Sequence, residues 1–185
     1  LLDDQKVPQQ LLGLEGRFDR VVFLLDRSSS MDEKDRGDND RWSESISTIE
    51  TWLRYLPVRE VALITFGADI DEYPGGARYL PKKDGLESLV QKLQSMRPTG
   101  ETKTMEALQR AYGFRDVDAI FLFTDGMPNS AGGNARDIRD FVKSQRAQGC
   151  QIRIHTVGVG DYFKQGLGEF LRGLAADTGG TFIGR

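Results

Sequence analysis

The chain has 185 residues, of which 38% are hydrophobic and 29% charged, with a formal net charge of -3. This composition is too apolar for a disordered chain, and the length is enough for one domain with its own core. The longest uninterrupted apolar runs, Val21–Leu25 and Ala119–Phe123, are far shorter than the ~20 residues of a membrane-spanning helix, so we expect no direct membrane insertion by this segment. No basic stripe is present, which argues against a nucleic-acid partner.

The sequence indicates one domain that is preceded by a short N-terminal segment. Residues 1–17 contain proline and glycine and are expected to be an N-terminal lead-in or linker, followed by one domain over residues 18–185. The single cysteine, Cys150, excludes an internal disulfide. The first residue is Leu and not Met, so we expect a piece of a longer protein. We also expect this domain to be monomeric.

Continuous apolar runs predict buried strands, and apolar residues at helical spacing predict helices between them. In chain order the predicted elements are a strand at Val21–Leu25, a helix from Trp42 to Leu56, a strand at Val61–Phe66, a turn at Asp69–Gly76, a short strand at Ala77–Leu80, a helix over Leu86–Met96, a helix at Thr104–Phe114, a strand at Ala119–Phe123, a helix from an Asn134 cap to Gln148, a strand at Ile152–Val159, a helix at Gly166–Thr178 and a last strand at Thr181–Ile183.

Strands that alternate with helices predict an α/β fold with a doubly wound, mostly parallel open sheet and helices on both faces. We expect about six strands, in a Rossmann-like arrangement. No helix separates Val61–Phe66 from Ala77–Leu80, so the second of these is expected to be an antiparallel strand at the sheet edge.

Polar residues follow two of the buried strands directly. Asp26 ends the first run and is followed by serines, and Asp125 comes after the run Ala119–Phe123. A third polar loop, Gly100–Thr104, opens a helix. If the first and third buried strands are neighbours, these carboxylates and hydroxyls converge at the carboxyl edge of the sheet, where ligands of such sheets bind. Hard oxygen ligands suit Mg²⁺, Mn²⁺ or Ca²⁺.

Three motifs carry a resemblance to a known family. Asp26-Arg27-Ser28-Ser29-Ser30, the run Gly100–Leu108 and Phe123-Thr124-Asp125-Gly126 resemble the three parts of the metal-ion-dependent adhesion site of von Willebrand factor type A domains. Ile154–Gly160 and Leu174–Phe182 are similar to the corresponding segments of bacterial members. The resemblance covers the chain from Phe18 to its end and implies the Rossmann-like fold of that family.

The resemblance also implies roles for single residues. Ser28 and Ser30 would coordinate a divalent cation through their hydroxyls, and Thr102 would do so directly or through water. Asp26 and Asp125 would hold metal-bound waters and the serine hydroxyls. It implies a non-enzymatic protein-binding module that uses Mg²⁺, or Mn²⁺ or Ca²⁺, to bind an Asp or Glu carboxylate of a protein partner.

The chain departs from the family pattern near this site. Ser29 stands where the family has a glycine, and the loop Met31–Arg41 is longer and more charged than usual. The alternative function is a Mg²⁺-dependent, haloacid-dehalogenase-like phosphohydrolase with Asp26 as nucleophile. Such enzymes carry a second aspartate two residues later, where this chain has Ser28, which cannot act as a general acid at neutral pH.

Three further expectations concern single residues and the location of the protein. His155 is expected to be a core residue because it lies within a predicted strand. Trp52 lies off the apolar stripe of its helix and is expected to be partly exposed. The likeness to bacterial members favours the cell envelope, or the extracellular face of a membrane-anchored bacterial protein, over the cytoplasm.

Overall fold

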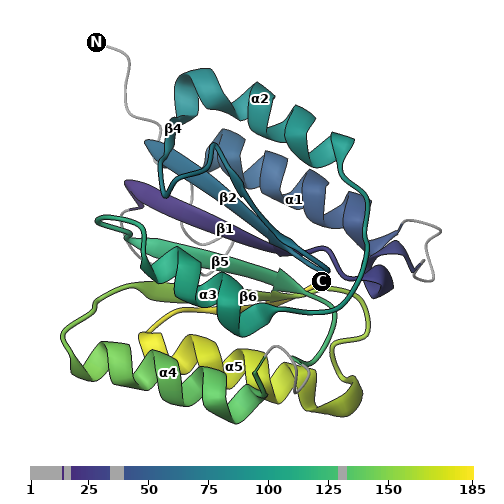
Figure 1. Ribbon diagram of the computed structural model, residues 1–185, viewed down its shortest axis with the longest axis vertical. Coiled ribbons are helices and arrows are strands. Elements are labelled where there is room, and N and C mark those ends of the chain that lie inside the picture. Colours follow the sequence, from purple (N-terminus) through teal and green to yellow (C-terminus); the bar gives the residue numbers. More distant parts are fainter. Residues whose placement is uncertain (1–13, 15–17, 34–39, 129–132) are drawn as a thin grey trace.

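The fold is built on one sheet of seven strands. The structure, a computed structural model, describes Leu14 and residues 18–33, 40–128 and 133–185 (Figure 1). The strand order is β3-β2-β1-β5-β6-β7, and β4 pairs with β2 beside β3. The strands are β1 Arg20–Asp26, β2 Glu60–Phe66, β3 Ile70–Tyr73, β4 Leu80–Pro81, β5 Ala119–Thr124, β6 Arg153–Gly158 and β7 Phe182–Gly184.

Helices cover both faces of this sheet, as Figure 1 shows. α1 (Arg41–Tyr55) and α2 (Lys82–Ser95) pack on one face. α3 (Thr104–Tyr112), α4 (Ala135–Ala147) and α5 (Leu167–Thr178) pack on the other. β1 pairs in parallel with β2 and β5, and β6 is parallel to both β5 and β7. The predicted doubly wound, mostly parallel open sheet is therefore confirmed.

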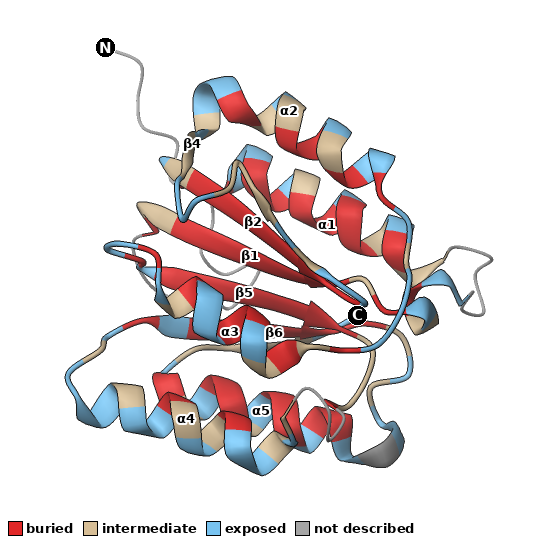
Figure 2. Ribbon diagram, in the orientation of Figure 1, coloured by how far each residue is buried: buried red, intermediate tan, exposed pale blue. Residues whose placement is uncertain are grey.

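The central strands are buried along nearly their whole length because helices lie above and below them (Figure 2). Alternate residues of β1 point to opposite faces, so Phe23 belongs to the core under α1 while Leu24 belongs to the core under α3. The Phe23 ring stacks on Phe121 with ring centroids 5.3 Å apart. These paired apolar faces explain why the continuous runs were correct predictors of strands.

The prediction for Trp52 was wrong. Only 2% of its surface is exposed, and its ring centroid lies 5.2 Å from that of Phe121 and 5.4 Å from that of Phe123. The broad face of the sheet accepts a wider apolar stripe from α1 than the narrow stripe read from the sequence. His155, in contrast, is a core residue as predicted: it is 1% exposed, and its ring contacts those of both Phe18 and Phe121.

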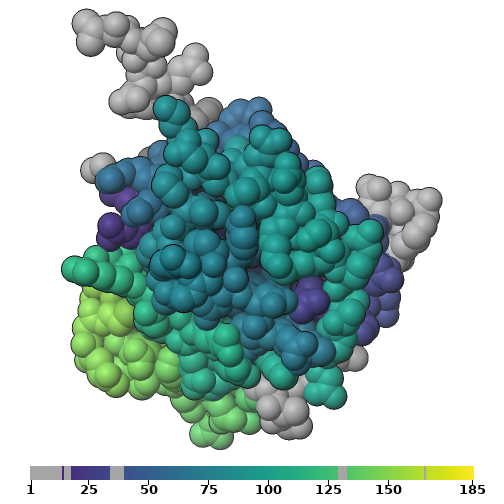
Figure 3. All heavy atoms as spheres, turned by 45° about the horizontal axis from the view of Figure 1, so that its top comes forward, coloured from purple at the N-terminus to yellow at the C-terminus, as the bar shows by residue number. Residues whose placement is uncertain are grey.

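The edge of the sheet beside β2 differs from the prediction. The main antiparallel strand there is β3, which lies within the segment predicted to be a turn, and β4 (Leu80–Pro81) shares only Leu80 with the strand predicted at Ala77–Leu80. Ile-Asp-Glu-Tyr is an exposed-edge sequence whose charged residues hide the strand signal, and such charges protect sheet edges from further pairing. The segment from β3 through β4 to α2 covers this side of the molecule in the space-filling view (Figure 3).

The helix boundaries follow local signals. Asn134 caps α4 as predicted, since its side chain accepts a hydrogen bond of 2.9 Å from the Asp137 N–H. None of the helices in the described part of the chain is long and apolar enough to cross a membrane. The predicted lead-in, residues 1–17, lies outside the described residues except for Leu14, which is buried in the core under α1.

Candidate functional site

The strand order reverses between β1 and β5, because the chain runs outward from β1 to β2 and later from β5 to β6 on the other side. Ligands of open α/β sheets bind beyond the carboxyl ends of the strands at such a point. β1 ends at Asp26 and β5 ends at Thr124, and the register aligns Leu25 with Phe123. Two residues singled out from the sequence, Asp26 and Asp125, are thus brought to the same place.

Asp26 is the most deeply buried polar residue of this edge, with no exposed surface. One carboxylate oxygen accepts a hydrogen bond of 2.5 Å from the Thr124 hydroxyl, and the other accepts one of 2.8 Å from the Ser28 N–H. Burial raises the pKa of Asp26 to about 6, although both hydrogen bonds act to lower it. The carboxylate therefore carries its charge at neutral pH at a cost to stability.

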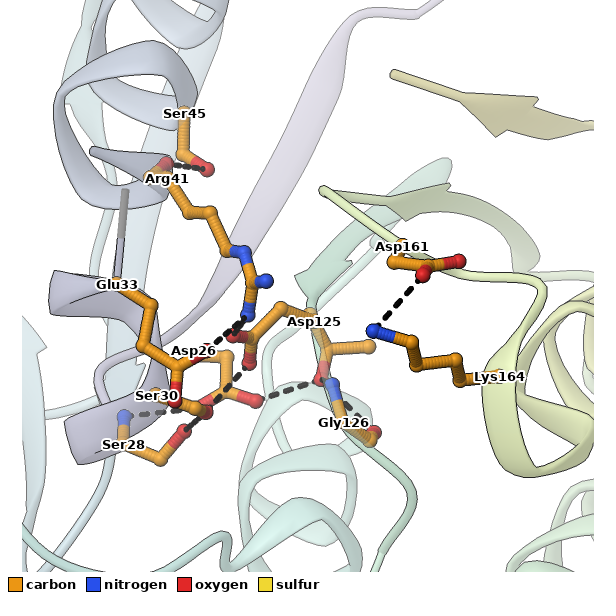
Figure 4. A network of polar contacts seen from close by, with 11 residues as sticks. Asp26, Ser28, Ser30, Glu33, Arg41, Ser45, Asp125, Gly126, Asp161 and Lys164 are labelled. Carbon is orange, nitrogen blue, oxygen red and sulfur yellow. Dashed lines mark hydrogen bonds and ion pairs between the residues drawn. The ribbon is translucent and has the colours of Figure 1, made fainter. Parts of the chain in front are cut away.

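The two serines lie directly beside this carboxylate, where the chain enters a short 3-10 helix, η2 (Ser29–Asp32). The Ser28 and Ser30 hydroxyl oxygens are 3.1 Å apart, and the Ser30 hydroxyl donates to Asp125 Oδ1 at 2.8 Å. Figure 4 shows these side chains converging with Asp26. Neighbouring ligands of an octahedral Mg²⁺ ion lie about 3 Å apart, so the serine spacing fits two adjacent ligands of such an ion.

The donor set decides which metal suits this arrangement. Within the part of the chain that the structure describes, no three His, Cys, Asp or Glu side chains form a metal-binding group. The oxygens gathered here are two serine hydroxyls and two carboxylates, which suit a hard cation and do not suit zinc or copper. The residues present therefore fit the Mg²⁺, Mn²⁺ or Ca²⁺ expected from the sequence.

The loop before α3 is fastened to the serine loop through Ser29 and Gly100. The Ser29 N–H donates to the Gly100 carbonyl at 3.2 Å, and the Gly100 N–H donates to the Ser29 hydroxyl at 3.0 Å. Gly100 has φ +83°, and a Cβ there would collide with Ala68, so glycine is required. The serine that replaces the family's glycine does not adopt a left-handed backbone, and its hydroxyl forms part of this connection.

Thr102 lies on this loop and is buried, with 8% of its surface exposed. Among the hydrogen bonds of the described residues, none joins its hydroxyl to the two serines or to the two aspartates. The Thr104 hydroxyl, two residues on, is buried without a hydrogen-bond partner in the described part. The structure thus gathers Asp26, Ser28, Ser30 and Asp125 into one network and places Thr102 on the adjoining loop.

Arg41 also belongs to this network, although it was not among the site residues predicted from the sequence. Its guanidinium forms an ion pair with Asp125, with Arg41 Nη1 2.8 Å from Asp125 Oδ2, and a longer one with Glu33 at 3.4 Å. The Asp125 side chain is fully buried, whereas 66% of the Glu33 side chain is exposed. An arginine at the first position of a helix was the only signal, because that position usually favours acidic side chains.

A small pocket of about 140 Å³ opens beside Asp125 and Arg41. Met127 and Leu167 form apolar parts of its wall, and Lys164 stands at its rim, 2.9 Å from Asp161. Phe163, the residue before Lys164, is 76% exposed and lies against Tyr162 with ring centroids 4.4 Å apart. The site therefore adjoins a pocket of mixed charge and an exposed aromatic ring.

The arrangement argues against Asp26 as a nucleophile. Its carboxylate is fully buried, and both oxygens accept hydrogen bonds from the chain itself. A phosphoryl group would have to displace these bonds to reach it. The position two residues on is Ser28, which already lies next to Ser30 and offers no carboxylic acid.

Comparison with known proteins identifies relatives of the chain. Residues 21–127 match the family model described as von Willebrand factor type A domain. The human von Willebrand factor A domain-containing protein 3A is 27% identical over 93 residues, which are 50% of this chain and 7% of that protein. The chain therefore spans only a small part of this much longer relative.

Solved structures share the fold. An aerotolerance-related membrane protein from Bacteroides fragilis is 21% identical with a TM-score of 0.69, and 90% of this chain and 91% of that chain are covered. The manganese-loaded TRAP protein of Plasmodium vivax is 16% identical with a TM-score of 0.61, over 86% of this chain and 63% of that one. At these identities the likeness concerns the fold alone, and the bacterial type of the domain stays a prediction.

Proposed function

The chain belongs to the von Willebrand factor type A domain family, and we propose that it is a non-enzymatic protein-binding module that uses a divalent cation to bind a partner's carboxylate. Domains of this family are generally interaction modules without enzymatic activity, and many bind divalent metals. The proposed cation is Mg²⁺, Mn²⁺ or Ca²⁺. The proposed partner is a protein that presents an Asp or Glu side chain.

One observation carries this proposal. Residues nearly a hundred positions apart, Ser30 and Asp125, meet at the switch point of the sheet, and Ser28 and Asp26 adjoin them. The resulting cluster consists of oxygen atoms at a spacing suited to a hard cation. It also lies where the carboxyl ends of the strands leave an opening to solvent.

Each residue has a distinct role in this proposal. Ser28 and Ser30 hold the cation through their hydroxyls, and Thr102 holds it directly or through water. Asp26 keeps the Ser28 backbone in place and, with Asp125, holds the waters around the cation. A divalent cation bound mainly by neutral hydroxyls keeps much of its positive charge and can therefore bind one more anionic oxygen as a ligand.

The surroundings of the cluster support a protein as the partner. Among the described residues, Tyr55 and Phe163 are the large apolar side chains that stand out as exposed, and Phe163 lies at the edge that carries the cluster. Exposed aromatic residues often dominate protein–protein contacts. The pocket beside Asp125 has room for a small side chain next to the partner's acid.

Two measurements test the proposal in sequence. Calorimetry with MnCl₂ should show binding in the micromolar-to-millimolar range, consistent with hydroxyl ligands. Two peptides, Gly-Asp-Gly and Gly-Asn-Gly, both acetylated at the N-terminus and amidated at the C-terminus so that only the Asp side chain offers a carboxylate, are then titrated into isotope-labelled protein with MgCl₂ or with EDTA. We expect amide signals near Ser28 and Gly126 to shift only with the Asp peptide and only with Mg²⁺.

Two results would overturn the proposal. If calorimetry detects no Mn²⁺ binding at millimolar concentration, the site is not a metal site. If the Asp and Asn peptides shift the same signals equally, the cation does not select a carboxylate. The location in a bacterial envelope, and the place of this domain in a longer protein, are part of the same proposal.

A further inference from the structure

A guanidinium group lies inside the cluster that we assign to a metal. Only 13% of the Arg41 side chain is exposed, and it reaches from the start of α1 to the fully buried Asp125 carboxylate at 2.8 Å (Figure 4). The chain therefore supplies a positive charge of its own to a carboxylate that the proposed function assigns to the surroundings of a divalent cation.

The local structure of α1 does not account for this arginine. The N-terminus of a helix carries a partial positive charge, which disfavours a basic side chain at its first position. Asp40 already caps the helix, because its carboxylate accepts a hydrogen bond of 2.6 Å from the Ser43 N–H. The position of Arg41 is therefore explained by its ion pair with Asp125 and not by stabilisation of the helix end.

Both oxygens of the Asp125 carboxylate have partners. Its Oδ1 accepts a hydrogen bond from Ser30, and its Oδ2 pairs with Arg41. A divalent cation bound to the serine hydroxyls would need the same carboxylate to hold its waters. It would also stand close to the guanidinium, and two positive charges a few ångströms apart repel strongly where little water intervenes.

A second carboxylate lies within reach of Arg41. Glu33 Oε2 is 3.4 Å from Arg41 Nη1, and the Glu33 side chain is 66% exposed. The backbones of the two residues are also joined, since the Arg41 N–H donates to the Glu33 carbonyl at 3.3 Å. The guanidinium can therefore leave Asp125 for Glu33 by a side-chain rotation while the backbone stays in place.

We infer that Arg41 sets the metal affinity of this site as an internal counter-cation: it pairs with Asp125 in the metal-free protein and turns to Glu33 when a divalent cation binds. This inference rests on the proposed function. One consequence is cooperation between metal and partner, because a partner carboxylate adds the negative charge that offsets two neighbouring cations. The site then fills most readily when both are present.

The test measures Mn²⁺ binding by calorimetry on the full chain and the melting temperature in EDTA. Arg41→Met removes the charge and keeps the apolar stem, so we expect Mn²⁺ affinity to rise about 10-fold or more and the melting temperature in EDTA to fall. Glu33→Gln removes the second carboxylate and should weaken Mn²⁺ binding about threefold or more, with little change in EDTA.

Lys164→Met is the matched control. Lys164 lines the same pocket but pairs with Asp161, so its removal changes the general electrostatic field without releasing Asp125. We expect its Mn²⁺ affinity to change less than threefold. If Arg41→Met fails to fold, Arg41→Gln keeps a hydrogen-bond donor for Asp125 and should still raise the affinity.

Nuclear magnetic resonance gives a direct readout of the side chain. The Arg41 Nε–H signal should move when MgCl₂ is added to the wild type, and it should move differently in Glu33→Gln. Unchanged Mn²⁺ affinity in both Arg41 variants, or an equal rise in Lys164→Met, would overturn the inference and leave the metal site standing. Absence of Mn²⁺ binding in the wild type and in the Arg41 variants would overturn the proposed function as well.

Discussion

The two ends of the sheet differ in how deeply their charged side chains are buried. At the carboxyl end, Asp26 and Ser28 are buried and hydrogen-bonded to each other, and Asp125 pairs with an arginine that is itself largely buried. At the amino end, Arg20 pairs with Glu60 at 2.6 Å while both side chains remain about one-third exposed. Charges are withdrawn from water at one end and left in water at the other.

The amino end also has a groove, but it is built from different groups. A wide opening of about 910 Å³ lies between the end of α1 and the start of α2, lined by Tyr55, Leu86 and several basic residues. The Lys82 ammonium donates to the Leu56 carbonyl at 2.6 Å and so caps the C-terminus of α1. The charge of Lys82 thus stabilises the end of a helix. At the carboxyl end, the charged side chains instead surround the cluster formed by the serine hydroxyls and the two carboxylates.

Buried polar side chains therefore indicate the functional site more reliably than the mere presence of charged side chains does. Desolvated groups cost stability, and a fold retains them where another purpose is served. If this is correct, substitutions at the buried carboxyl end should have large effects and substitutions at the exposed amino end small ones. The expected effects are given in decreasing order.

The double replacement Ser28→Ala and Ser30→Ala should abolish measurable Mn²⁺ binding, because it removes both hydroxyl ligands. The fold should persist, since the core is formed by the apolar strands and helices and not by the metal. Calorimetry and circular dichroism check the two statements. Ser88→Ala on α2, whose hydroxyl donates to the Gly85 carbonyl of the same helix, is the control and should bind Mn²⁺ as the wild type does.

A second prediction concerns a titratable group that is buried in the core, away from both ends of the sheet, and its effect on stability. Burial lowers the pKa of His155 to about 4 from its ordinary 6.5, so the unfolded chain takes up a proton more readily than the folded chain as the pH falls. The contribution of His155 to the free energy of unfolding should therefore fall by roughly 3 kcal/mol between pH 6.5 and pH 4, measured as the difference between the wild type and a variant without this histidine. His155→Gln does not titrate and can still accept from the Thr181 N–H.

Urea denaturation across this pH range compares the two proteins. Asp26 titrates in both proteins, so the comparison isolates His155, and the wild type should become less stable relative to His155→Gln as the pH falls from 6.5 to 4. Parallel pH profiles of the two proteins would contradict the assignment of a neutral, buried ring.

The third prediction concerns Asp26 in the metal-free protein. Its pKa is raised from 3.8 to about 6, so the folded chain binds a proton more readily than the unfolded chain, and stability falls as the pH rises through this window. Asp26→Asn should therefore be more stable than the wild type above pH 6 by roughly 2 kcal/mol in EDTA, allowing for the weaker hydrogen bonds of an amide. The gain should vanish below pH 4.

Burial is the main cause of this shift in the pKa of Asp26, and repulsion by Asp125 adds a smaller part. Asp116→Asn at the amino end is the matched control. Asp116 is exposed and has φ +52°, a backbone conformation that asparagine tolerates. A similar gain in both variants in thermal or urea unfolding would remove the distinction between the two ends.

The smallest effect is expected at the amino end. Glu60→Gln breaks the ion pair with Arg20, but the pair is exposed and Arg20 keeps a second contact with Asp116 at 3.1 Å. Exposed ion pairs contribute little because water and salt screen them. Urea denaturation should resolve no change in stability, and a clear loss would show that this edge also depends on its charges.

Much of the fold could be predicted from the sequence because it depends on local patterns. Strands buried on both faces require continuous apolar runs, and Asn134 marks the start of α4 through a contact three residues away. The edge strand β3 could not be predicted, because its residues are only half-buried and the strand forms by pairing with β2, which leaves no local pattern in the sequence. Trp52 was misplaced because the width of the buried stripe depends on the sheet beneath the helix.

The sequence by itself determined which residues could form the site: Asp26, Ser28 and Ser30 follow one strand, and Asp125 follows another. That these residues meet follows from the fold, because the contact from Ser30 to Asp125 spans 95 positions and needs β1 beside β5. The same is true of Arg41, which lies 84 positions from Asp125. A contact across such a distance leaves no periodic or local signal, since it depends on the order of the strands and not on the neighbouring residues.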